Sequence, residues 1–198
     1  ADNQIINFKE KKVLLVCGVD RFGMAESLEE AGATVTYGDL IFGLGISIPL
    51  GSLKTLEMAA RVLAPIASQL PFEMIYPIGK KQEVSIDKFG QYYQEADIIA
   101  GDFLFIKRYL PAHLVGKTII TNTVTREDIE LLRARGVARL ITTTPEFNGR
   151  SFGTNVMEAC LVALAGNNQE LTAEDYNRLL DKLNFAPRIL DLTEANLA

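Results

Sequence analysis

Two kinds of hydrophobic pattern alternate along the chain. Short runs dominated by apolar and β-branched residues predict β-strands, and longer stretches with apolar residues three or four positions apart predict α-helices. The predicted strands are "KVLLVCG" (12–18), "TVTYGD" (34–39), "FEMIYP" (72–77), "DIIAGD" (97–102), "KTIITNT" (117–123) and "ARLITTT" (138–144). The predicted helices cover 22–31, 53–69, 85–95, 103–111, 125–135 and 153–165, and Thr125 is the expected N-cap of the fifth. Strands and helices therefore follow one another in a regular alternation.

The predicted strands are apolar at most positions and do not alternate with polar residues. This composition is typical of strands whose sheet is covered by helices on both faces. Helical connections of this length join parallel strands, and such crossovers are right-handed in nearly all proteins. The pattern therefore predicts an α/β fold: a doubly wound, mostly parallel, six-stranded sheet that is Rossmann-like, with helices on both faces.

The length of 198 residues fits a single domain built on this sheet. Residues 1–11 precede the first predicted strand and form an N-terminal extension. Residues 170–198 add a C-terminal helix and, around 187–192, a short edge strand. Pro187 suits an edge position, because proline cannot donate a hydrogen bond to a neighbouring strand.

Composition narrows the classes of function. The net charge of −5 argues against a nucleic-acid-binding surface, because such surfaces are basic. No apolar stretch reaches the roughly 18 residues that span a membrane. Cys17 and Cys160 both stand in apolar runs, which predicts two buried thiols in a reducing compartment and no metal site. We therefore expect a cytoplasmic protein that binds a small molecule.

The segment "GVDRFG" joins the first predicted strand to the first predicted helix. The residues of this turn that would surround a phosphate at the positive end of the helix are Gly18, Asp20, Arg21 and Gly23. Asp39 ends the next strand about 20 residues later, where dinucleotide-binding folds place the acid that binds the ribose. A carboxylate there repels a 2′-phosphate, so the pattern favours NAD over NADP. The middle glycine of G-x-G-x-x-G is absent, so a strand–turn–helix without a ligand remains the alternative.

Polar residues crowd the carboxyl ends of the later predicted strands, where ligands bind in α/β sheets. The candidate substrate-binding residues are Asp102, Asn122, Thr143, Arg150 and Asn155. As an alternative to the dinucleotide, Arg21 and Arg150 with the helix starts at 22 and 153 would form a pocket for a phosphorylated or carboxylated metabolite. The single histidine, His113, stands in a loop-like segment, and no catalytic base is assigned.

Four longer strings are similar to a known family: "GVDRFGMAE", "YGDLIFGLG", "YLPAHLVGKTIITNT" and "GVARLITTTPEFNGRSFGTNVMEA". Together, over roughly residues 12–166, they resemble a group of bacterial proteins commonly labelled quinate 5-dehydrogenase. The resemblance implies a quinate/shikimate dehydrogenase-like oxidoreductase whose NAD-binding domain orients the nicotinamide beside a polyol-type substrate. In that group the matching segment is the later part of a longer protein, so the resemblance also implies further chain before residue 1.

Two functions therefore stand as expectations. The first is the NAD-binding domain of a quinate/shikimate dehydrogenase-like oxidoreductase, with NAD as the cofactor. The second is a non-catalytic binding or sensor domain for a phosphorylated or carboxylated metabolite. A group-transfer enzyme with another adenine-containing cofactor ranks third. It too would use the acid after the second strand, so Asp39 alone does not separate it from the first. Whether the chain forms a homo-oligomer stays open.

Overall fold

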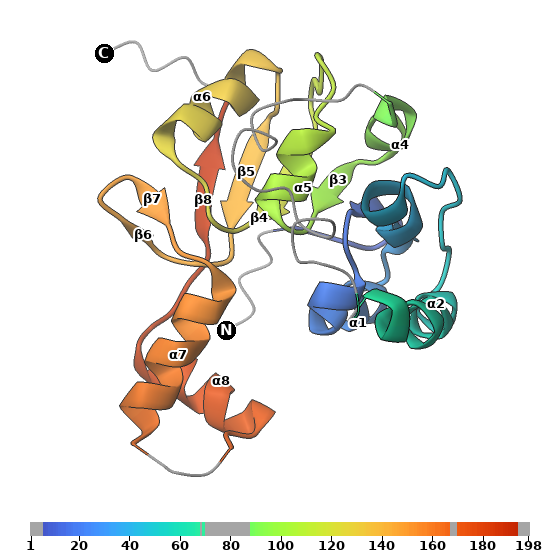
Figure 1. Cartoon of the computed structure of the whole chain (residues 1–198). Coiled ribbons are helices and arrows are strands. Elements are labelled where there is room, and N and C mark those ends of the chain that lie inside the picture. Colours follow the sequence, from blue (N-terminus) through green and yellow to red (C-terminus); the bar gives the residue numbers. More distant parts are fainter. Residues whose placement is uncertain (1–5, 68, 70–87, 167–169, 194–198) are drawn as a thin grey trace.

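A computed structural model describes residues 6–67, 69, 88–166 and 170–193. Its centre is a six-stranded sheet with the strand order β2-β1-β3-β4-β5-β8 (Figure 1). The strands are β1 (Lys12–Leu15), β2 (Thr34–Tyr37), β3 (Ile98–Ala100), β4 (Thr118–Thr121), β5 (Arg139–Thr142) and β8 (Arg188–Asp191). The first five strands run parallel, and β8 pairs antiparallel with β5 at one edge.

Helices, two helical turns and one small hairpin connect these strands. The helices are α1 (Phe22–Glu30), α2 (Leu53–Ala67), α4 (Gly90–Glu95), α5 (Phe103–Arg108), α6 (Arg126–Ala134), α7 (Thr154–Ala165) and α8 (Ala173–Lys182). The helical turns are η1 (Val19–Arg21) and η2 (Asp39–Gly43), and the hairpin consists of β6 (Glu146–Phe147) and β7 (Arg150–Ser151). None of the helices in the described part of the chain is both long and apolar enough to cross a lipid bilayer.

The α/β class and the six-stranded, mostly parallel sheet are confirmed. Five of the predicted strands form β1 to β5, and each is shorter than predicted because the chain leaves the sheet early for the connecting turn. The sixth strand is β8, so the edge strand expected around 187–192 is present and begins directly after Pro187. The strand predicted at 72–77 lies outside the described residues.

Proline and N-cap residues in the sequence decide where several of the helices begin or end. The helix predicted over 103–111 ends at Arg108, because the residue before Pro111 is disfavoured in a helical conformation. The helix predicted over 85–95 begins only at Gly90, and residues 85–87 lie outside the described part. α6 begins as predicted with Thr125 as its N-cap. The Thr125 Oγ1 atom accepts from the Asp128 N–H at 3.3 Å, and the Asp128 carboxylate accepts from the Thr125 N–H in return.

Hydrophobic side chains cover both faces of the sheet. Because successive strand residues point to opposite faces, Leu14 of β1 joins one buried cluster while Val13 and Leu15 join another. The first cluster contains residues of α4, α5 and α6, and the second contains residues of α1 and α2. Helices therefore pack on both faces, as the apolar strands predicted.

α7 and α8 extend from the body of the sheet as a helical pair (Figure 1). Most residues of α7 are apolar, yet only Leu161 is buried. Val156 is 48 % exposed and Leu164 is 62 % exposed. An apolar composition of this kind is typical of a core helix, yet α7 lies largely at the surface.

Candidate functional site

A large cavity opens at the carboxyl ends of the central strands, and we call it the edge cavity. Its volume is about 670 Å³. It is lined by Asp20, Arg21, Asp102, Asn122, Thr123, Arg150, Gly153, Thr154, Asn155 and Val156. These residues follow β1, β3 and β4 or belong to the segment from β7 to the start of α7, so four separate parts of the sequence meet there.

The order of the strands explains why the cavity forms at this place. From β1 the chain moves to β2 on one side, and β3 then returns to the other side of β1. The connections after β1 and β3 therefore leave in opposite directions, which opens a crevice between their carboxyl ends. Arg21 follows β1 and Asp102 follows β3, so both lie at this crevice.

An ion pair joins the two sides of the crevice. The Arg21 Nη2 donates to the Asp102 Oδ2 at 3.0 Å, and both side chains are largely buried. The other oxygen of Asp102 accepts from the Leu104 N–H at 2.9 Å and so caps α5. Asp102 thus holds the Arg21 guanidinium at the cavity wall. The Nε of Arg21 is buried and has no hydrogen-bond partner among the described residues.

The end of β4 carries two unusual features. Asn122 is only 2 % exposed, and its Oδ1 has no hydrogen-bond partner in the described part of the protein. Thr123 has a φ of 47°, a left-handed conformation that is costly for a β-branched residue. Unsatisfied polar atoms and local backbone strain are both more common at functional sites than elsewhere. Both residues line the edge cavity, so the strained backbone and the buried unpaired oxygen belong to its wall.

The amino end of α7 faces the same cavity. Its N-cap is Gly153, which has no side chain to accept from the first N–H groups of the helix. Thr154 and Asn155, the first two helical residues, line the cavity. The positive end of a 12-residue helix therefore lies at the cavity wall without a side-chain cap, which is the arrangement that binds anions.

Arg150 is held beside this helix start by the β6–β7 hairpin. The turn of the hairpin is Asn148-Gly149, with φ values of 53° and 82°, the conformation that a two-residue hairpin needs. The next residue, Ser151, is buried and ties the hairpin to the segment after β4, because its Oγ accepts from the Val124 N–H at 2.8 Å. Within the described chain, no carboxylate pairs with the exposed Arg150 guanidinium, so its charge is available to a ligand.

Two of the residues predicted to bind NAD, Gly18 and Asp39, bond to each other. Asp39 does reach the turn after β1, but its two oxygens accept from the N–H groups of Gly18 at 3.0 Å and Val19 at 2.9 Å. Burial raises the pKa of Asp39, and these two bonds offset part of that rise. A Cβ atom on Gly18 would lie 2.9 Å from both Leu56 and Tyr37. Side chains therefore pack closely against Gly18, and the Asp39 carboxylate is engaged by the backbone of the same turn.

The structure divides the predicted site residues into groups. Six of them line the edge cavity: Asp20, Arg21, Asp102, Asn122, Arg150 and Asn155. Gly18 and Asp39 bond to each other at the turn after β1, and Gly23 stands exposed at the start of α1 with open space around it. Thr143 lines a different cavity. The sequence did not single out Thr123 or Thr154, although each directly adjoins a predicted site residue.

The two cysteines have different environments. Burial and the nearby carboxylates of Asp39 and Asp20 raise the pKa of the Cys17 thiol, whose Sγ lies 3.5 Å from an Asp20 oxygen. Cys160 lies exposed on α7, so the prediction of a second buried thiol is wrong. The reason is the surface position of α7, which its apolar sequence did not predict. In the described part of the chain no three His, Cys, Asp or Glu side chains are grouped as metal ligands would be.

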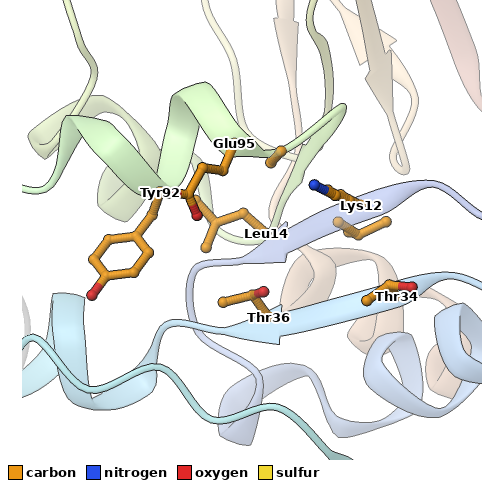
Figure 2. Close-up of a pocket in the computed structure, with 8 residues that line it drawn as sticks. Lys12, Leu14, Thr34, Thr36, Tyr92 and Glu95 are labelled. Atoms are coloured by element: carbon orange, nitrogen blue, oxygen red, sulfur yellow. The ribbon is translucent and has the colours of Figure 1, made fainter.

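A second cavity lies between the sheet and α4, away from the edge cavity. Lys12 and Leu14 of β1 and Thr34 and Thr36 of β2 line it, and α4 contributes Tyr92 and Glu95 (Figure 2). Its volume is about 240 Å³. It contains none of the predicted site residues, and its single lysine and single glutamate offer no excess charge. It is therefore a poorer candidate for a binding site than the edge cavity.

Comparison with known proteins identifies a family whose description names no activity. A family model described as "Domain of unknown function (DUF8754)" matches residues 1–192. The chain belongs to this family. No curated protein and no solved structure matches it. The family description names no reaction or ligand, so the resemblance to quinate 5-dehydrogenase proteins stays a prediction.

Proposed function

We propose that the protein binds a small phosphorylated or carboxylated metabolite in the edge cavity, as a binding or sensor domain. The observation that carries the proposal is the uncapped amino end of α7, which lines the cavity beside the unpaired Arg150. Helix N-termini and arginine side chains both bind phosphate and carboxylate groups. In this proposal the sheet is doubly wound and Rossmann-like. The ligand binds between the carboxyl ends of β1 and β3, where the chain reverses the direction in which it adds strands.

The charges of the lining residues indicate what else the ligand carries. Asp102 is already balanced by Arg21 and by the N–H group at the start of α5, so it adds little negative potential. Asp20 contributes a further carboxylate to the lining. A ligand that combines one anionic group with hydroxyl or amine donors therefore suits the cavity better than a bare polyanion.

The proposal is for binding without turnover. A general base works best when its pKa lies near the operating pH, and histidine is the side chain that meets this condition without perturbation. The only histidine of the sequence, His113, does not line the edge cavity. The lining instead offers hydrogen-bond donors and fixed charges, which hold a ligand in place.

Isothermal titration calorimetry with inorganic phosphate, methyl phosphate and L-malate tests this function. We expect at least one of these probes to bind, and Arg150→Ala to weaken its binding about tenfold or more, since a hydrogen bond to a charged group contributes roughly 1.5–3 kcal/mol. The control is Arg61→Ala, which removes an exposed arginine on α2 that pairs with Glu57. No binding of any probe, or equal binding by wild type and Arg150→Ala, would contradict the proposal.

NAD binding is the second candidate, and one observation favours it. Asp39 lies at the turn after β1, as the ribose-binding acid of a dinucleotide fold must. Against it, Leu56 and Tyr37 fill the space beside Gly18. Titration of NAD, NADH and NADPH with the melting temperature as readout separates the two functions. Stabilisation by NAD or NADH, without stabilisation by phosphate or L-malate, would favour the quinate/shikimate dehydrogenase-like oxidoreductase.

A further inference from the structure

A third cavity lies on the other side of α7, and we call it the apolar cavity. Its volume is about 330 Å³. The side chains that give it an apolar character are Met157 and Leu161 of α7, Leu180 of α8 and Phe185. Thr143 and Thr144, at the end of β5, form the side toward the sheet. An enclosed apolar cavity of roughly 150 Å³ is enough to hold benzene. This one is larger and open to solvent on one side, so it has room for a ring or a branched aliphatic group.

Three hydroxyl groups around the apolar cavity already have partners. The Tyr176 hydroxyl donates to the Glu158 carboxylate at 3.3 Å. The Thr144 hydroxyl donates to the Phe152 carbonyl at 2.6 Å, and the Thr143 hydroxyl donates to the Thr121 carbonyl at 3.4 Å. With these groups engaged, the cavity offers mainly apolar surface to a ligand. The apolar cavity therefore suits an apolar group, whereas the edge cavity suits an anionic one.

The two cavities meet at one residue. Thr154, the first residue of α7, lines both of them. Asn155 and Val156 turn toward the edge cavity, and Met157, Glu158 and Leu161 turn toward the apolar cavity. A single small molecule that passes the exposed first turn of α7 can therefore contact both.

We infer that the ligand is amphiphilic: its phosphate or carboxylate binds in the edge cavity, and an aromatic or branched aliphatic group binds in the apolar cavity. This inference rests on the proposed function and adds the chemical class of the ligand. It also accounts for Thr143, which the sequence predicted as substrate-binding and which the structure separates from the other predicted residues. Thr143 contacts the apolar part of the ligand, while Arg150 contacts the anionic part.

The test compares matched pairs of probes by isothermal titration calorimetry. The phosphate pair is methyl phosphate and phenyl phosphate, and the carboxylate pair is propionate and 3-phenylpropionate. We expect the phenyl member of at least one pair to bind wild type about tenfold more tightly or better, since burying a few extra carbon atoms in an apolar pocket gives gains of this size. The pair that shows the gain identifies the anionic group.

Substitutions test whether the phenyl group of the probe binds in the apolar cavity. Leu180→Asp puts a charge in its wall and should abolish the advantage of the phenyl probe, with less than a twofold change for the probe that lacks the ring. Leu183→Asp is the matched control, because Leu183 is exposed at the end of α8 and does not line the cavity. It should keep both affinities. If Leu180→Asp does not fold by circular dichroism, Met157→Asp on α7 replaces it with the same expected result.

The outcomes separate this inference from the proposed function. Equal binding of the two members of each pair by wild type overturns the amphiphilic ligand and leaves anion binding in the edge cavity intact. The amphiphilic ligand is also overturned if the phenyl advantage persists in the folded Leu180→Asp or Met157→Asp protein. If no probe binds at all, the proposed function fails and the inference fails with it.

Discussion

At the scale of single residues, Asp39 has a structural role beside the ligand contact that its position predicted. The sequence places this acid where a dinucleotide-binding fold places its ribose ligand. In the structure its carboxylate accepts from the Gly18 and Val19 N–H groups, so it holds the turn after β1 in shape. A substitution at Asp39 would therefore change the fold of the turn as well as any ligand contact, and it cannot by itself test NAD binding.

The pH dependence of stability should reflect the burial of Asp39. Its pKa is raised above the ordinary value of 3.8, chiefly by burial, so the folded state binds more protons than the unfolded state just above pH 3.8. The free energy of unfolding of wild type minus that of Asp39→Asn should therefore fall as pH rises from below 4 through the folded-state pKa of Asp39. Above that pKa the difference should level off. Urea unfolding at several pH values measures this difference.

A control is needed for the loss of one negative charge. Asp181→Asn removes an exposed acid on α8 and provides it. If the stability of wild type relative to Asp39→Asn instead rises with pH, Asp39 is not destabilised by burial in its charged form.

At the scale of elements, the turn between β1 and α1 is built for close packing. Gly18 is buried against Leu56 and Tyr37, and both of these side chains are fully buried. They cannot move aside easily, so the glycine is required for the approach of α2 to the sheet. The glycine pattern of "GVDRFG" thus has a packing explanation at its first position.

Gly18→Ala should therefore destabilise the protein, by about 1–3 kcal/mol as expected for an overpacked site. Gly23→Ala is the matched control in the same segment, because a Cβ there meets nothing within 4 Å and Gly23 is helical. It should leave the stability unchanged or raise it by up to about 1 kcal/mol. Guanidinium unfolding measures both. A tolerated Gly18→Ala would show that the space beside this glycine is open after all.

At the scale of the whole molecule, the position of α7 decides the chemistry. α7 extends from the sheet (Figure 1). Its amino end therefore reaches the edge cavity, and one of its sides lines the apolar cavity. The same position exposes several of its apolar side chains and Cys160. A helix packed into the core would have closed both cavities.

Thiol reactivity checks this arrangement. We expect dithiobis(nitrobenzoate) to modify Cys160 readily in the native protein, and Cys17 only after denaturation, because burial and nearby carboxylates keep the Cys17 thiol protonated. Cys160→Ser should abolish the native reaction and leave the denatured one. A protected Cys160 in the native protein would show that α7 is covered in solution.

The sequence by itself determined the elements of this protein. The period of the apolar residues identified β1 to β5 and the helices, because that period follows from the local geometry of strands and helices. Thr125 and Pro187 marked the start of α6 and of β8 through their own hydrogen-bonding capacity. Local signals of this kind depend on a few neighbouring residues, so the chain carries them without reference to its fold.

Only the tertiary structure decided which predicted residues act together. The ion pair between Arg21 and Asp102 joins positions 81 residues apart, and it exists because β3 lies next to β1. The separation of Thr143 from Arg150 depends on where α7 lies relative to β5. Strand order and helix placement follow from the packing of the whole chain, and hydrophobic periodicity does not encode them. The physical reason is that periodicity fixes which face of an element is buried, but not which other element covers it.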